Sequence, residues 1–184
     1  MEPSRKLWTR TEYRRLTEDE FLQDGKVELI NGEIWNKTAQ GRRHVVAVML
    51  MLKALAPVFG FEHIQLQSSL PLSEDSDPEP DVAALRQSLD QYVDVDPTPA
   101  DTLLVVEAAN TSLCADLTIK QAMYARSGIP EYWVVDIPNR LLHVFREPTI
   151  DGYASEILLT IDDEVRPLAA PNSVVRVAEL LPPA

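Results

Sequence analysis

Two acidic residues stand where the hydrophobic pattern predicts the ends of buried strands. Asp81 follows Pro80 at the start of an apolar segment, and Glu107 closes the apolar run at residues 103–106. A carboxylate is costly to bury without a partner. On neighbouring strands the two could share a hard cation such as Mg²⁺, which activates water and stabilises charge on a phosphate. Alternatively, Glu107 could be a buried acid satisfied by hydrogen bonds, and Asp81 could cap a turn.

A lysine further along the chain could complete such a site. Lys120 lies 13 positions after Glu107, on an expected helix, and a lysine beside a metal-bound water could orient that water or accept its proton. Asp116 stands four residues before Lys120, so these two side chains could instead form an ordinary surface ion pair. The spacing leaves both interpretations open.

Other catalytic motifs are missing from the sequence. The six glycines form neither a GxGxxG nor a GxxxxGK[ST] phosphate loop, and no GxSxG nucleophile elbow occurs. The three histidines, His44, His63 and His143, have no cysteine at metal-ligand spacing, which argues against a zinc site. Carboxylate chemistry is what remains.

Composition predicts one folded domain over residues 1–184, with residues 1–15 as a candidate flexible arm. Hydrophobic residues make up 45% and charged residues 25% of the chain, which is average for globular proteins. The net charge of −12 argues against broad electrostatic binding of nucleic acid or of an anionic membrane. Any nucleic-acid contact must therefore be local, and Arg42 and Arg43 beside His44 are the candidates for it.

The expected location is the cytoplasm, with no membrane segment. A single cysteine, Cys114, cannot form an internal disulfide, and no secretory signal pattern opens the chain. The most apolar stretch, residues 45–59, is interrupted by Lys53 and Pro57 and is shorter than the roughly 20 residues of a spanning helix.

The first elements should be a short helix and a hairpin. Thr17 and Glu20 have the spacing of a capping box, which predicts a helix that starts at Thr17. Residues 26–35 form two β-prone runs around Asn31-Gly32, which suits a type I′ turn and places Glu28 opposite Trp35.

The later segments alternate between helix and strand. Apolar residues recur at helical spacing from His44 to Gly60, and a second helix should run from residue 112 to 127. The acidic stretch 74–101 is expected to be mostly solvated loop. Strands are expected at residues 62–67, 81–85, 102–109 (in the middle of the sheet), 131–136 and 141–146, with peripheral strands at 155–161 and 174–177.

This order of features resembles the bacterial restriction-endonuclease-like family within the PD-(D/E)xK nuclease superfamily. The resemblance spans residues 16–181, and its most specific motifs are the runs at 28–33, 80–82, 105–107 and 124–136. It implies an α/β (α+β) fold: a restriction-endonuclease-like core with a mixed sheet flanked by helices, an N-terminal β-hairpin and peripheral C-terminal strands.

The resemblance also implies roles for individual residues. Asp81 and Glu107 match the family's metal-binding acids, and the backbone carbonyl of Ala108 would add a third ligand to Mg²⁺, for which Mn²⁺ can substitute. The superfamily's usual lysine position is occupied by Ala109, so Lys120 on the next helix would take that role. Two further positions match: Glu28, the family's N-terminal acid and a further catalytic candidate, and His44, which opens the second helix.

The expected activity is therefore a metal-dependent endonuclease acting on nucleic acid, most simply DNA. Two alternatives stay open: an interaction or regulatory module whose metal site has decayed, which Ala109 and Leu117 favour, and a hydrolase of a small phosphorylated compound. A homodimer could form through exposed aromatics; alternatively, these aromatics belong to the core. The aromatics concerned are Tyr132, Trp133 and Phe145.

Overall fold

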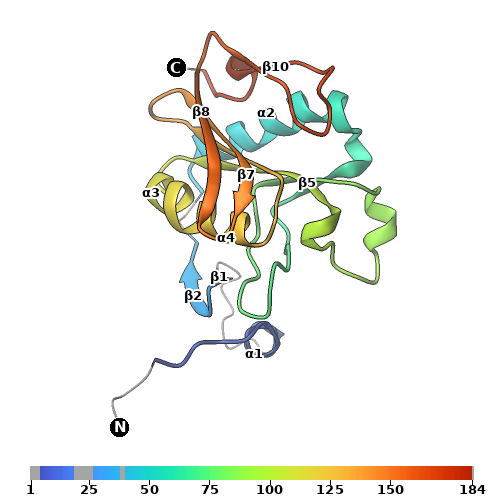
Figure 1. The fold of residues 1–184 in the computed structure, drawn as a ribbon, viewed down its shortest axis with the longest axis vertical. Helices are drawn as coiled ribbons and strands as arrows, with labels where there is room; N and C mark the ends of the chain where they lie inside the picture. Colours follow the sequence, from blue (N-terminus) through green and yellow to red (C-terminus); the bar gives the residue numbers. More distant parts are fainter. Residues whose placement is uncertain (1–4, 19–26, 38–39, 184) are drawn as a thin grey trace.

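A six-stranded mixed sheet forms the centre of the computed structural model, which describes residues 5–18, 27–37 and 40–183 (Figure 1). The strands follow one another across the sheet in chain order; β5 and β6 run parallel, and the other neighbouring pairs are antiparallel. A parallel pair needs a crossover connection, which the helical segment between β5 and β6 supplies. The strands are β3 (Ile64–Leu66), β4 (Val82–Leu85), β5 (Thr102–Ala109), β6 (Glu131–Asp136), β7 (Leu141–Thr149) and β8 (Gly152–Thr160).

Helices and small hairpins surround this sheet. In Figure 1, α1 and the β1–β2 hairpin lie together at the lower end, whereas α2 and β10 lie at the upper end. The main helices are α1 (Arg10–Glu18), α2 (Arg42–Phe59), α3 (Leu113–Ala115) and α4 (Gln121–Arg126), with a π-helical turn at Asp116–Lys120 between the last two. The short strands are β1 (Val27–Ile30), β2 (Glu33–Asn36), β9 (Glu164–Val165) and β10 (Val175–Arg176), and 3₁₀ turns occur at Phe61–His63, Leu89–Tyr92, Pro99–Asp101 and Val177–Glu179.

The core has two parts, one on each face of the sheet. Side chains alternate along β5, so Leu104, Val106 and Ala108 face α2, whereas Val105 and Ala109 face α4. The second set contributes to a cluster with Met123, Tyr124 and Tyr132. Glu107 is two residues from both Val105 and Ala109. Residues two apart on a strand share a face, so the side chain of Glu107 also lies on the α4 face. The predicted fold class, a mixed sheet flanked by helices, is confirmed.

The predicted hairpin is confirmed in its turn and its register. Asn31 and Gly32 both have positive φ, of 52° and 77°, as a type I′ turn requires. Glu28 pairs with Trp35, and Ile30 with Glu33. Directly paired residues of an antiparallel ladder share a face, so the side chains of Glu28 and Trp35 lie on the same face.

The first helix differs from its prediction. Thr17 lies near the end of α1, and Glu20 is outside the described residues. The helix begins with a different capping box: Thr9 N donates to Glu12 Oε2 at 2.9 Å, and Glu12 N donates to Thr9 Oγ1 at 3.3 Å. Two Thr-x-x-Glu patterns compete here, and the earlier one starts the helix. Residues 9–15, in the candidate flexible arm, are therefore largely helical.

The other predicted elements match with small shifts in their ends. The helix over residues 112–127 is present as α3, the π turn and α4, with Gly128 at φ 78° beyond it. The apolar face of α2 buries Ala47, Val48, Met51 and Leu55, whereas Met49, another apolar residue of the helix, is 55% exposed.

The acidic stretch is mostly exposed loop, as predicted, with buried exceptions. Besides Asp81, Asp77 is buried, and it pairs with Arg14 at 3.2 Å. Tyr132, Trp133 and Phe145 are core residues, at most 4% exposed, so the interpretation that they belong to the core is confirmed and the alternative of an exposed dimer surface is excluded. Among the described residues, no helix has the length and apolar character needed to cross a membrane.

Candidate active site

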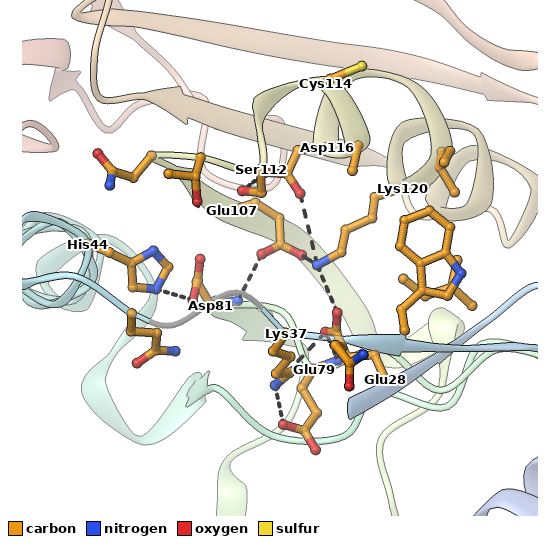
Figure 2. Close-up of a pocket in the computed structure, with 18 of the residues that line it drawn as sticks. Glu28, Lys37, His44, Glu79, Asp81, Glu107, Ser112, Cys114, Asp116 and Lys120 are labelled. Atoms are coloured by element: carbon orange, nitrogen blue, oxygen red, sulfur yellow. Dashed lines mark hydrogen bonds and ion pairs between the residues drawn. The ribbon is translucent and has the colours of Figure 1, made fainter. Parts of the chain in front are cut away.

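A cavity of about 500 Å³ lies beside the carboxyl end of β5 and the start of β4. Its wall brings together residues from the hairpin, α2, the loop before β4, and the helix after β5 (Figure 2). Five carboxylates line it against three basic side chains. The acids are Glu28, Glu79, Asp81, Glu107 and Asp116, and the bases are Lys37, His44 and Lys120.

Glu107 is the most highly connected side chain of the cavity. Its Oε1 accepts hydrogen bonds from Lys120 Nζ at 2.9 Å and from Tyr124 Oη at 3.0 Å, and its Oε2 accepts one from Asp81 N at 3.4 Å. Burial raises the pKa of Glu107 to about 8; the neighbouring acids add to this shift, and Lys120 opposes it. Only 4% of the residue is exposed.

Asp81 lies next to Glu107 because of the pairing between β4 and β5. Val82 is opposite Val106, so one further step along the antiparallel ladder brings position 81 to position 107. The carboxylate of Asp81 is then fixed by two donors: Ala108 N at 2.9 Å from Oδ2, and Gln67 Nε2 at 3.1 Å from Oδ1.

His44 lies between β5 and Asp81. Its Nδ1 is 3.0 Å from the carbonyl oxygen of Ala108, and its Nε2 is 3.0 Å from Asp81 Oδ1. Nδ1 forms a hydrogen bond with that carbonyl, whereas Nε2 is buried without a hydrogen-bond partner among the described residues, so its contact with Asp81 is a close ion pair of the protonated ring. Consistent with this, Asp81 raises the pKa of His44, and although burial alone would raise the pKa of Asp81, the contacts with His44 hold it below its ordinary value.

Lys120 lies among three carboxylates. Besides Glu107, its Nζ is 3.3 Å from Glu28 Oε2 and 4.0 Å from Asp116 Oδ1. Burial favours the neutral amine, but Glu107 and the other acids outweigh it and raise the pKa of Lys120. The lysine is therefore a permanent cation at neutral pH. Its side chain is 12% exposed, so the alternative of a surface pair with Asp116 is wrong.

The helix that carries Lys120 departs from α-helical geometry at the site. Residues Asp116–Lys120 form a π turn, a rare geometry that is frequent at functional sites. Ser112 precedes the helix and donates its hydroxyl to Asp116 Oδ2 at 2.6 Å, whereas Asp116 Oδ1 is buried with no hydrogen-bond partner among the described residues. Burial raises the pKa of Asp116.

Glu28 is held in place from the opposite side of the cavity. Its Oε1 accepts a hydrogen bond from Glu79 N at 2.8 Å, which ties the hairpin to the loop before β4. Lys37 contacts both acids: it forms an ion pair with Glu79 and lies 4.0 Å from Glu28 Oε1.

The structure thus brings together Asp81, Glu107, Lys120 and Glu28. His44, predicted as a nucleic-acid contact, instead lies against Asp81 and is largely buried. Arg42 and Arg43 are exposed at the start of α2 and do not line the cavity. The Ala108 carbonyl, predicted as a metal ligand, accepts the contact from His44 Nδ1.

Tyr124 and Gln67 contact the two central acids and were not predicted from the sequence, nor were Lys37 and Glu79 of the cavity wall. Tyr124 lies one helical turn after Lys120, and this i, i+4 spacing was the available signal. Gln67 follows β3, and its place beside Asp81 depends on the pairing of Leu66 with Val82. No local motif encodes that pairing.

Comparisons with known proteins agree with this architecture. Residues 10–178 match the family model Uma2, which is described as "Putative restriction endonuclease". A search of curated proteins finds no match. Among solved structures, a "putative nuclease belonging to DUF820" from Anabaena variabilis is similar, with a TM-score of 0.70 and 16% sequence identity. The match covers 88% of this chain and 95% of that protein. At this level of identity, the structural match supports the fold.

Proposed function

Because the chain belongs to the Uma2 family of restriction-endonuclease-like proteins, we propose that it is a divalent-metal-dependent endonuclease that hydrolyses phosphodiester bonds of nucleic acid, most simply DNA. The observation that carries the proposal is the meeting of Asp81 and Glu107 at the end of the sheet, with Lys120 Nζ 2.9 Å from Glu107. Glu28 adds a fourth charged group on the far side of Lys120.

The residues present fit a hard divalent cation. Among the described residues, no cluster of three or more acids, histidines or cysteines is arranged to bind a metal alone. Mg²⁺, however, commonly uses one or two carboxylates and takes its other ligands from water and substrate phosphate. The cavity's carboxylates outnumber its basic groups by five to three, so a divalent cation would offset an excess of negative charge.

In this proposal Asp81 and Glu107 hold Mg²⁺ or Mn²⁺. When bound, such an ion activates water and stabilises the charge that develops on a phosphate. The protonated ammonium of Lys120 can donate hydrogen bonds to an attacking water or to a phosphate oxygen. Because its neighbours raise its pKa, Lys120 is suited to orienting and charge stabilisation, and not to taking a proton. His44 and Gln67 fix the carboxylate of Asp81.

The first test is the binding of Mn²⁺ by calorimetric titration. We expect saturable binding by the wild type and its loss in Glu107→Gln and Asp81→Asn, with circular dichroism to verify folding. Glu62→Gln removes an exposed acid outside the cavity and serves as the matched control.

Hydrolysis of labelled DNA with Mn²⁺ should fall in the same two variants, Glu107→Gln and Asp81→Asn. Unchanged activity in both would refute the assignment. Absence of binding to the wild type at millimolar metal would favour the decayed interaction module.

A hydrolase of a small phosphorylated compound is a second candidate. The bounded cavity and the net charge of −12 favour it, because a small ligand does not need an extended basic surface. Hydrolysis of a simple phosphoester, with no cleavage of any oligonucleotide, would support this candidate over the endonuclease.

A further inference from the structure

One wall of the cavity is apolar and faces the charged groups. Trp35 and Ile30 come from the hairpin, and Ile119 comes from the helix after β5; all three line the cavity. Trp35 and Ile119 also pack against the core cluster that contains Tyr124 and Ile30. The indole is therefore anchored on one side while it remains part of the cavity wall. The proposed hydrolysis gives this wall no role.

The hairpin register brings this aromatic surface close to the proposed chemistry. Trp35 pairs directly with Glu28, so the two side chains share one face of the hairpin. Glu28 Oε2 lies 3.3 Å from Lys120 Nζ, and Lys120 contacts Glu107. The indole of Trp35 is therefore a direct neighbour of Glu28, and Glu28 in turn contacts Lys120.

We propose that the cavity binds one unstacked nucleotide of a single DNA strand, with its base against Trp35 and its phosphate toward Lys120. This inference rests on the proposed endonuclease function and names its substrate class. Binding pockets with mostly apolar walls and a few convergent polar groups are typical for ligands of nucleotide size, and 500 Å³ lies within their usual range. Stacking on an aromatic side chain accepts any base, because every base has a π face.

The depth of the charged groups favours a single strand over an intact duplex. The side chains of Asp81, Glu107 and Lys120 are only 10%, 5% and 12% exposed. With its phosphate at this depth, a nucleotide of an intact duplex can place its base against Trp35 only if that base leaves the stack, which costs a few kcal/mol. A single strand does not bear that cost. The overall charge of −12 also offers no extended basic surface for gripping a duplex.

The first experiment measures binding without hydrolysis. In a Trp8→Phe background with Ca²⁺ in place of Mn²⁺, the remaining indoles are Trp35 and the fully buried Trp133. We expect the oligonucleotide (dT)12 and thymidine monophosphate to quench the fluorescence, and we expect no quenching when Trp35→Phe is added. The absence of quenching by both probes in the Trp8→Phe protein would overturn the proposal.

The second experiment tests stacking through matched variants. Anisotropy of fluorescein-labelled (dT)12 should show binding weakened by about fivefold to a hundredfold in Trp35→Leu, which keeps apolar bulk but loses the aromatic face. Trp35→Phe should retain most of the affinity. Equal affinity in the wild type and Trp35→Leu, or equal losses in the two variants, would contradict a stacking role.

Cleavage with Mn²⁺ separates this inference from the proposed function. Faster cleavage of a single strand than of the matched duplex, reduced in Trp35→Leu, supports both. Equal cleavage of both substrates, unaffected by Trp35→Leu, overturns the inference and leaves the endonuclease standing. Trp35-dependent binding of (dT)12 without cleavage of any DNA overturns the endonuclease and leaves the nucleotide site standing.

Discussion

Glu107 combines near-complete burial with close contacts to both a cation and other acids, and its protonation should affect folding. Burial raises its pKa to about 8, against an ordinary value of 4.5, so the folded state binds a proton that the unfolded state releases. The stabilisation that comes from this proton is complete below pH 4.5 and is lost as the pH rises toward 8. In EDTA we expect the free energy of unfolding to fall across this range, by about 1 to 4 kcal/mol.

Denaturant unfolding between pH 5 and pH 8.5 measures this decline. Glu107→Gln, which cannot ionise, should flatten it, whereas Glu62→Gln should not. Saturating Mn²⁺ should also flatten the decline in the wild type, because a cation stabilises the ionised carboxylate. A decline of the same size in Glu107→Gln would show that other groups cause it.

His44 should act through Asp81 as a positioning residue. His44→Ala removes the contact to Asp81 Oδ1 and the hydrogen bond to Ala108, so we expect Mn²⁺ affinity or turnover to fall by about 10- to 100-fold. His44→Gln, whose amide can still donate to Asp81, should recover part of the loss. His63 also contacts a backbone carbonyl through Nδ1, that of Leu85, and lies outside the cavity lining. His63→Gln is therefore the matched control and should leave Mn²⁺ affinity unchanged.

At the scale of elements, the hairpin is the support for Glu28. Gly32 has φ +77°, and a Cβ there would lie 2.9 Å from Leu7 Cβ; Gly128 has φ +78° and open space around it. Both glycine-to-alanine changes should cost about 1 to 3 kcal/mol of backbone strain. Gly32→Ala should cost more, because Leu7 must also shift. Thermal or denaturant unfolding of the two variants checks this order, and hydrolysis should fall further in Gly32→Ala.

Elements with a strong local signal could be predicted from the sequence. Asn31-Gly32 specifies its turn through two positive φ angles, and the apolar run ending at Glu107 identifies a central strand. The end of α2 follows from Gly60, which has φ 91°. These signals depend only on residues that are close in the sequence, so they can be recognised without knowledge of the fold.

Features that depend on pairing between distant segments could not be predicted. Gln67 reaches Asp81 only because β3 pairs with β4, and His44 reaches it because α2 packs on the face of the sheet over β4 and β5. The start of α1 was predicted wrongly for another reason. Two capping-box patterns lie eight residues apart, and local propensity does not show which of them starts the helix. The sequence around Tyr132, Trp133 and Phe145 indicated strands. It did not indicate that both faces of these strands are covered by other elements, which is why all three side chains are buried.

For the molecule as a whole, the net charge of −12 limits how DNA can be held. Arg42 and Arg43 are the exposed basic pair at the start of α2, between the cavity-lining residues Gly41 and His44. If they contact two phosphates of a single strand, they should contribute about 1.4 to the slope of log Kd against log salt. Arg42→Ala/Arg43→Ala should lower the slope by that amount, while Lys53→Ala, on the same helix, should not. An unchanged slope in the double variant would contradict the predicted arginine contact.

The burial of the aromatic residues on β6 and β7 also changes the expected assembly. One support for the predicted dimer was the exposure of Tyr132, Trp133 and Phe145, and these side chains form the core on the two faces of the sheet instead. That basis for a dimer is removed.

The separation of Glu107 and Lys120 on different elements has a consequence for motion. A lysine at position 109 would be tied to Glu107 by the backbone of one strand, and the two would move together. Here the crossover segment carries the ammonium, on the π turn that leads into α4, so any opening of this turn and α4 from the sheet stretches the 2.9 Å contact. The integrity of the ion pair is therefore coupled to the local opening of one helix, and hydrogen exchange at the amides of α4 would report how often the site comes apart.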